Sequence, residues 1–253
     1  MKSIRSRLHA LYHGSSVTAI RFQRCIIAID IAVIAFFLAA PFIVERPVFL
    51  WLDYSIAVVV IVELTARALA SKDIRRWFRR VDFWVDLLIV ATLLAPLWLI
   101  NLSFLRILRL WTTSRSELFW RPLRKSGLGP REDAIKAVIS LITFLFVTTG
   151  FVYTFFAGAT EGLTTYVDAL YFTVATVTTT GFGDITLPGP AGKLTSVIAM
   201  IVGISLFVSM AQAIFRPRKV SFSCPQCALM RHDVDAVHCK ACGHALKIPD
   251  HDL

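Results

Sequence analysis

Residues 178–184 read Thr-Thr-Thr-Gly-Phe-Gly-Asp, so two glycines alternate with bulkier residues behind a run of threonines. Glycine adopts backbone angles that other residues avoid. Alternating Gly181 and Gly183 with Thr180 and Phe182 therefore allows successive carbonyl oxygens to point toward a common axis. A column of carbonyl oxygens can replace the water shell of a dehydrated cation. The segment predicts cation coordination by main-chain oxygens, whereas a glycine pair without further context would indicate only a turn.

Four cysteines near the end of the chain form a second group of possible ligands. They make two Cys-x-x-Cys pairs separated by eleven residues, at Cys224, Cys227, Cys239 and Cys242. Paired thiolates at this spacing can close on one tetrahedral Zn²⁺. The segment 221–248 is also too small to hold a core without such a site. Disulfides are the competing use, which a cytoplasmic location would disfavour. We therefore predict a small zinc ribbon with one structural Zn²⁺ per chain.

The composition predicts that these groups are positioned by a membrane protein. The 253-residue chain is 56% hydrophobic, carries a net charge of +10 and has a positive mean hydropathy. Its basic residues gather in four places separated by apolar stretches: 2–24, 67–80, 115–136 and 216–247. An excess of Lys and Arg in cytoplasmic loops orients membrane spans. The charge is thus explained without nucleic acid, and both termini are expected in the cytoplasm.

Cytoplasmic termini require an even number of spans, and six apolar stretches fit. Each of the longer stretches has roughly the 20 residues that cross a bilayer as a helix. The six predicted spans are 22–44, 48–70, 81–100, 101–114, 134–157 and 192–215. A shorter apolar helix, 166–178, precedes the glycine segment. Non-helical backbone at membrane depth is tolerated only where protein or a watery cavity surrounds it. The predicted fold is an all-α membrane protein.

The fourth span carries arginine at every third position with one gap. Arg106 and Arg109 are followed by Thr112 and then by Arg115. A spacing of three drifts around an α-helix, whereas it forms one straight row on a 3₁₀ helix. Carboxylates within or beside the other early spans are candidate counter-charges: Asp30, Asp53, Glu63, Asp82 and Asp86. Intramembrane carboxylates are costly enough to indicate such partners.

Residues 178–184 closely resemble the filter signature of potassium channels, Thr-Val-Gly-Tyr-Gly-Asp, with Thr180 for Val and Phe182 for Tyr. The arginine row resembles the voltage-sensing helix of voltage-gated cation channels. The chain is thus similar to six-transmembrane potassium channels over about residues 22–216. The resemblance implies a four-span voltage-sensor-like domain 22–115, a linker 116–133 and a two-span pore domain 134–216 with a re-entrant pore helix. The basic cytoplasmic N-terminus 1–21 and the zinc ribbon 221–248 complete the predicted organisation.

The resemblance also implies roles for individual residues. The filter carbonyls would come from Thr179, Thr180, Gly181, Phe182 and Gly183. Tyr171 and Phe172 match the aromatic pair that braces the filter, and Asp184 matches the carboxylate outside it. Phe182 lacks the tyrosine hydroxyl, and Ala175 replaces a glutamate found in some relatives, so we expect fewer lateral bonds. Gly203 falls at the inner-helix hinge, although close helix packing through a small residue is an alternative.

The implied function is passive, K⁺-selective conduction by a homotetramer in the cell membrane, gated by voltage through Arg106, Arg109 and Arg115. Val60 stands where the family often has an aromatic residue, and the row is short. A vestigial sensor is therefore the alternative, with gating by metal, redox state or a partner through the ribbon. A nucleic-acid adaptor on a membrane anchor would explain the ribbon but not the filter. The chain shows no nucleophile–base pair, phosphate loop or open catalytic zinc site, so no enzyme is expected.

Overall fold

The computed structural model describes residues 2–14, 16–39, 48–71, 74–95, 98–125, 129–215, 219–233 and 235–248. The chain divides into two compact units, residues 1–210 and 211–253. Parts of several predicted segments lie outside the described residues: 40–44 of the first span, 96–97 of the third, 126–128 of the linker and 216 at the end of the pore domain.

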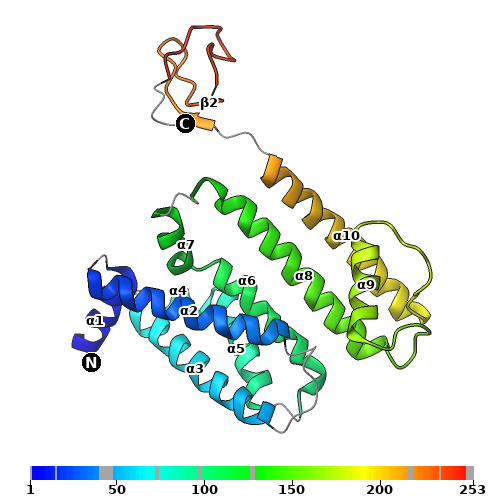
Figure 1. Ribbon diagram of the computed structural model, residues 1–253. Coiled ribbons are helices and arrows are strands. Elements are labelled where there is room, and N and C mark those ends of the chain that lie inside the picture. Colours follow the sequence, from blue (N-terminus) through cyan, green and yellow to red (C-terminus); the bar gives the residue numbers. More distant parts are fainter. Residues whose placement is uncertain are drawn as a thin grey trace. The chain divides into compact units, whose positions relative to one another are not determined.

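The first half of the larger unit is a bundle of helices. In order they are α1 (Lys2–His13), α2 (Val17–Ala39), α3 (Val48–Ala70), α4 (Ile74–Phe78), α5 (Val81–Leu94), the 3₁₀ helix η2 (Ile100–Ile107) and α6 (Leu108–Ser114) (Figure 1). α3 packs against α5, and η2 lies against both α2 and α5. A buried apolar cluster joins these helices and contains Val33, Phe37, Ala57, Ile89 and Leu93.

The second half of this unit contains α7 (Glu117–Lys125), the short 3₁₀ helix η3 (Gly129–Arg131), α8 (Glu132–Phe156), α9 (Tyr166–Val177) and α10 (Gly189–Phe215), whose last turn lies in the second unit. α8 packs along η2 and α6 on one side and against α9 on another. The core between α8 and α9 contains Val152, Phe156, Ala169 and Phe172. This core positions the segment that follows α9.

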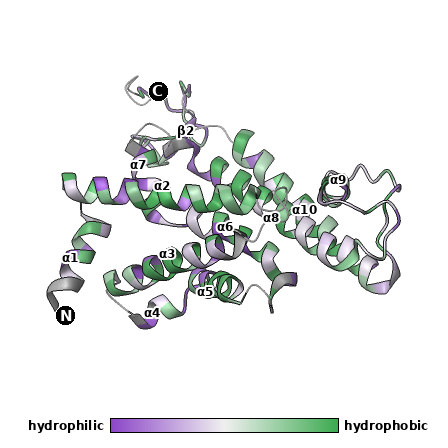
Figure 2. Ribbon diagram, turned by 60° about the horizontal axis from the view of Figure 1, so that its bottom comes forward, coloured by the Kyte–Doolittle hydropathy of each residue, from purple (hydrophilic) through white to green (hydrophobic). Residues whose placement is uncertain are grey.

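Three helices among the described residues are long and apolar enough to cross a membrane: α2, α8 and α10. Within their most apolar windows, 28%, 33% and 11% of the residues are buried inside the chain. In Figure 2 the ribbons of these helices are coloured mostly as hydrophobic. Apolar helix faces that the chain itself does not cover require lipid or another subunit. These helices agree with three of the six predicted spans, while α3, α5 and the η2–α6 segment leave the other three as predictions.

The helix boundaries differ most from the predicted ones in α2 and α5. α2 begins at Val17 rather than Phe22, because the Ser16 hydroxyl accepts a hydrogen bond from the Ala19 amide at 3.2 Å and caps the helix. The basic segment before it also forms a helix, α1. The third span is shorter than predicted, since α5 ends at Leu94.

In the described part of the smaller unit, β1 (Lys219–Ser221) and β2 (Arg231–Asp233) form an antiparallel pair of strands, with Val220 opposite His232. Its buried cluster consists of Cys224, Cys239 and Leu246, with Phe222, Leu229, Ala236 and Ile248 packed around it. A module of this size has little apolar core of its own. The cysteines therefore occupy the place that larger domains fill with aliphatic side chains.

Candidate functional site

The predicted filter begins where α9 ends. The N-terminus of α9 is fixed by a capping box, in which the Thr165 hydroxyl accepts from the Asp168 amide and the Asp168 carboxylate accepts from the Thr165 amide. These hydrogen bonds lower the pKa of Asp168 to about 2. At the other end, the amides of Thr180 and Gly181 both donate to the Ala175 carbonyl, at 2.9 and 3.1 Å. The filter segment is thus attached to the last turn of α9.

In this segment, residues with a positive backbone angle φ alternate with residues whose φ is not positive. Thr179, Gly181 and Gly183 have φ values of +59°, +50° and +80°, whereas Thr180 and Phe182 between them are not in the positive-φ region. Left-handed angles are rare for a β-branched residue such as Thr179 and mark a strained position. No described atom lies within 4 Å of a Cβ added to either glycine. Within one chain, the backbone angle and not crowding accounts for these glycines.

The two aromatic residues of α9 that were expected to brace the filter, Tyr171 and Phe172, lie in different places. The Tyr171 and Phe182 rings lie parallel, at 4° with centroids 6.2 Å apart. A hydrogen bond to Asp184 raises the pKa of the Tyr171 hydroxyl. Phe172 is instead buried in the α8–α9 core. Among the described residues, Tyr171 therefore supports the segment from the side through its ring against Phe182, and the expectation of fewer lateral bonds beside Phe182 and Ala175 stays a prediction.

Gly203 is buried on α10, opposite the end of α9. A Cβ at this position would lie 2.5 Å from Val177 Cγ2. The helix runs without interruption from Gly189 to Phe215. Close helix packing therefore accounts for the glycine in this structure, and bending at Gly203 stays a prediction.

The arginines of the fourth span bind different carboxylates. Arg106 lies in the 3₁₀ segment, where its guanidinium contacts Asp53 at 2.8 Å and the Thr92 carbonyl at 2.9 Å. The helix becomes α-helical at Leu108, so Arg109 belongs to α6 and leaves the straight row that a 3₁₀ helix would continue. Both side chains are buried.

Arg109 lies at the centre of a larger group that we call the charged cluster. Its guanidinium contacts Asp30 at 2.7 Å, Asp86 at 3.1 Å and Glu63. Arg67 contacts the same three carboxylates, at 3.3 Å for Asp30 and 3.8 Å for Asp86. Among the described residues the cluster therefore has one negative charge in excess when all five groups are ionised.

At the gap in the arginine row, the Thr112 hydroxyl donates to Asp86 of the charged cluster at 2.9 Å. The two remaining candidates, Arg115 and Asp82, lie outside this cluster. Arg115 is exposed and lies over the Trp111 ring at 4.5 Å. Asp82 pairs with Arg80 at 2.8 Å. The structure thus brings together four of the five candidate carboxylates with Arg106 and Arg109, and it adds the guanidinium of Arg67. The spacing of four from Glu63 was the sequence signal for Arg67.

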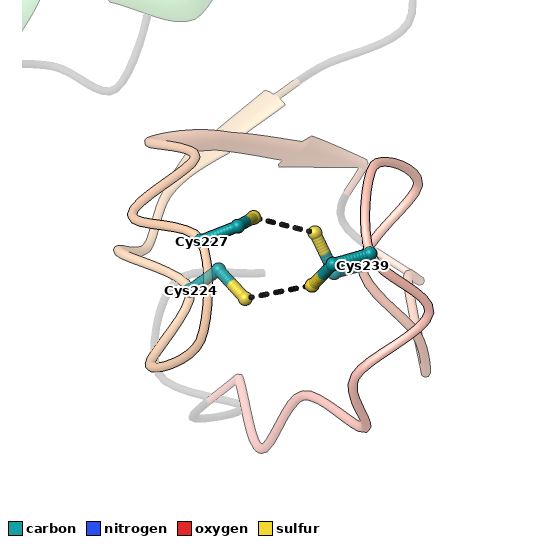
Figure 3. Close-up of side chains that lie close together, drawn as sticks. Cys224, Cys227 and Cys239 are labelled. Carbon is teal, nitrogen blue, oxygen red and sulfur yellow. Dashed lines mark hydrogen bonds between the residues drawn. The ribbon is translucent and has the colours of Figure 1, made fainter.

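The four predicted zinc ligands lie together in the small unit (Figure 3). Their sulfur atoms are all within 4.8 Å of one another, with Cys224–Cys242 at 3.6 Å and Cys227–Cys239 at 3.5 Å. Zn–S bonds of about 2.3 Å in a tetrahedron give sulfur–sulfur distances of about 3.8 Å, whereas a disulfide requires about 2.05 Å. The four thiols therefore fit a metal ion better than two disulfides.

Comparison with known proteins points to the region that contains α9 and the predicted filter. Residues 140–217 match a family described as "Ion channel". A hyperpolarization-activated voltage-gated potassium channel from Methanocaldococcus jannaschii is 30% identical over 80 residues, which cover 32% of this chain and 38% of that protein. The family match includes α9, the predicted filter and α10. The chain therefore contains an ion-channel region rather than the site of an enzyme, and it is distantly similar to a voltage-gated potassium channel.

Proposed function

We propose that the chain is one subunit of a homotetrameric, K⁺-selective channel. The observation that carries this proposal is the alternating left-handed backbone at Thr179, Gly181 and Gly183, between α9 and α10. Such alternation orients successive carbonyls toward one side, as a column of cation ligands requires. The carbonyls of residues 179–183 form this column, and K⁺ is the permeant ion.

Four chains around one axis complete the coordination. One chain provides one carbonyl per layer, whereas a cage for a dehydrated K⁺ takes four. In the single chain Phe182 is 69% exposed. The apolar surface of α10 is likewise mostly uncovered. Neighbouring subunits cover part of this surface, and lipid covers the rest.

Voltage gates the channel through Arg106 and Arg109. Both guanidinium groups are buried among carboxylates contributed by other helices, so each can exchange one partner for another if η2 and α6 move. Arg115, which is exposed, is the third charge of the row. Both termini lie in the cytoplasm, consistent with the distribution of basic residues.

The ribbon binds one structural Zn²⁺ per chain through Cys224, Cys227, Cys239 and Cys242. The sulfur–sulfur distances support this assignment. When bound, the metal supplies the cross-link that a module of this size needs to stay folded. Four thiolate ligands leave no open position for a substrate.

An alternative function follows from the same clusters. Arg109 is held by three carboxylates and is almost fully buried, which also suits a purely structural arginine. In that case the channel is K⁺-selective but gated by metal, redox state or a partner acting on the ribbon. Whether opening depends on voltage distinguishes the voltage-gated channel from the ribbon-gated one.

Recording purified channels in planar bilayers tests the proposal. Under opposed K⁺ and Na⁺ gradients, we expect a reversal potential near the K⁺ equilibrium value and an open probability that changes with voltage. A reversal potential near zero refutes K⁺ selectivity. A constant open probability over a range of roughly 300 mV, which is worth about 7 kcal/mol per elementary charge, favours the alternative.

A further inference from the structure

Gly150 leaves a space on α8 that Phe104 of η2 fills. A Cβ added to Gly150 would lie 2.3 Å from Phe104 Cβ and 2.9 Å from its Cγ, much closer than the separation of about 3.5–4.0 Å at which carbon atoms meet. Phe104 also meets Phe151 edge to face, with ring centroids 6.2 Å apart. We call this contact the Gly150 notch. η2 approaches α8 so closely because residue 150 has no side chain.

The notch exists at one position along α8. Gly150 is the only glycine between Glu132 and Phe156. The residues one turn away in either direction are all larger: Phe146, Val147, Tyr153 and Thr154. Because packed helix surfaces have few voids, the Phe104 ring fits against α8 in one axial register.

The notch and the Arg106 ion pair stabilise the same position of η2. Phe104 and Arg106 lie two residues apart on this 3₁₀ helix and move together with it. A displacement by three residues along such a helix is about 6 Å. That distance would separate Arg106 from Asp53, now at 2.8 Å, and would also withdraw Phe104 from the notch.

α8 links the notch to the helix that carries the filter. Val152, two residues beyond Gly150, is fully buried and packs in one cluster with Phe156 of α8 and Phe172 of α9. Phe151, which meets Phe104 edge to face, also packs against this cluster. Contiguous packed side chains therefore run from η2 to α9 through Phe151. This route does not pass through α7, which is attached separately, for example by the Trp120 indole hydrogen bond to the Ser114 carbonyl at 2.6 Å and by Lys136 of α8 over the Trp120 ring.

We propose that Gly150 is a positioning residue for gating, which couples the position of η2 to the pore helix α9 within one chain. This inference rests on the proposed function, because it presupposes a voltage-dependent channel. The notch favours the position of η2 seen here. A displaced η2 either moves away from α8 or pushes against it, and α8 transmits that change to α9.

Gly150→Ala tests the notch, with Gly158→Ala as the matched control. No described atom lies within 4 Å of a Cβ at Gly158. In planar bilayers at the wild-type midpoint voltage, we expect Gly150→Ala to change the ratio of open to closed channels about tenfold, a change of about 1.4 kcal/mol. Gly158→Ala should change it less than about twofold. The K⁺ reversal potential should be that of wild type in both variants.

A double-mutant cycle with Phe104→Gly shows whether the two residues act through contact. Phe104→Gly removes the Cβ that the new methyl group of Gly150→Ala would meet. The double variant should therefore change the ratio of open to closed channels by less than the product of the two single effects. The inference is overturned if Gly150→Ala leaves the ratio unchanged or if the two effects multiply. If Gly150→Ala does not assemble, Phe104→Leu and Phe104→Ala decide, since wild-type ratios in both also overturn it.

The outcomes for the notch and for the channel are distinct. A wild-type channel without voltage dependence removes the proposed voltage gating, and with it the role of Gly150. A voltage-dependent wild type with no effect at Gly150 or Phe104 removes the notch inference alone.

Discussion

Arg106 forms an ion pair with a single carboxylate, that of Asp53. Replacing both residues together can therefore remove this gating charge without leaving an unpaired buried ion. Arg106→Gln alone would strand Asp53, and breaking a buried pair costs about 3–5 kcal/mol. Asp53 is 5% exposed and Arg106 is 9% exposed, so this cost would shift the midpoint of gating and mix with the effect of the lost charge. The double variant Arg106→Gln/Asp53→Asn replaces the ion pair by two neutral amides and avoids it.

The expected effect is on the steepness of gating. An elementary charge that crosses the whole field at about 100 mV contributes about 2.3 kcal/mol. If Arg106 and Arg109 both cross, each subunit contributes about 4.6 kcal/mol, and the double variant should contribute about half of this. We therefore expect the slope of open probability against voltage to fall by about half. The control Asp53→Asn should shift the midpoint and keep the wild-type slope.

Open probability in planar bilayers over a range of voltages measures both quantities. A double variant with the slope of wild type would show that Arg106 does not move in the field and that this part of the arginine row is structural. A slope reduced equally in Asp53→Asn would show that the loss of the carboxylate, and not of the moving charge, causes the change.

Three further predictions concern the filter and the ribbon. Gly181→Ala should abolish K⁺ current while tetramers still assemble, because φ is +50° there; normal single-channel conductance would contradict the filter assignment. Tyr171→Phe keeps the ring that lies parallel to Phe182 and removes the hydroxyl that interacts electrostatically with Asp184. Current should therefore start normally and decay several times faster at constant voltage, with an unchanged reversal potential; a wild-type decay would show that the hydroxyl does not support the filter. Cys239→Ser should lower the zinc content measured by elemental analysis from about one per chain to near zero. A chelator should unfold residues 221–248 while the thermal melting of the membrane helices is unchanged. A zinc content well below one per chain in the wild type would refute the site.

The sequence was sufficient where the chemistry is local in the chain. The predicted filter lies within seven consecutive residues, and its two glycines are at positive φ, as their conformational freedom allows. The left-handed Thr179, by contrast, has no signal in residue type. The cysteine pairs could likewise be assigned, because two Cys-x-x-Cys turns have only to meet across one small module.

The tertiary structure alone decided which distant side chains meet. Arg109 binds Asp30, 79 residues away, whereas Asp82 turns to Arg80. Both carboxylates had been equal candidates, since composition does not give the rotation of a helix about its axis. The change from 3₁₀ to α-helix at Leu108 also separates Arg106 from Arg109. Gly150 carried no sequence signal, because its meaning depends on Phe104 lying opposite. Local backbone geometry can be read from neighbouring residues, but a contact between helices depends on the packing of the whole bundle.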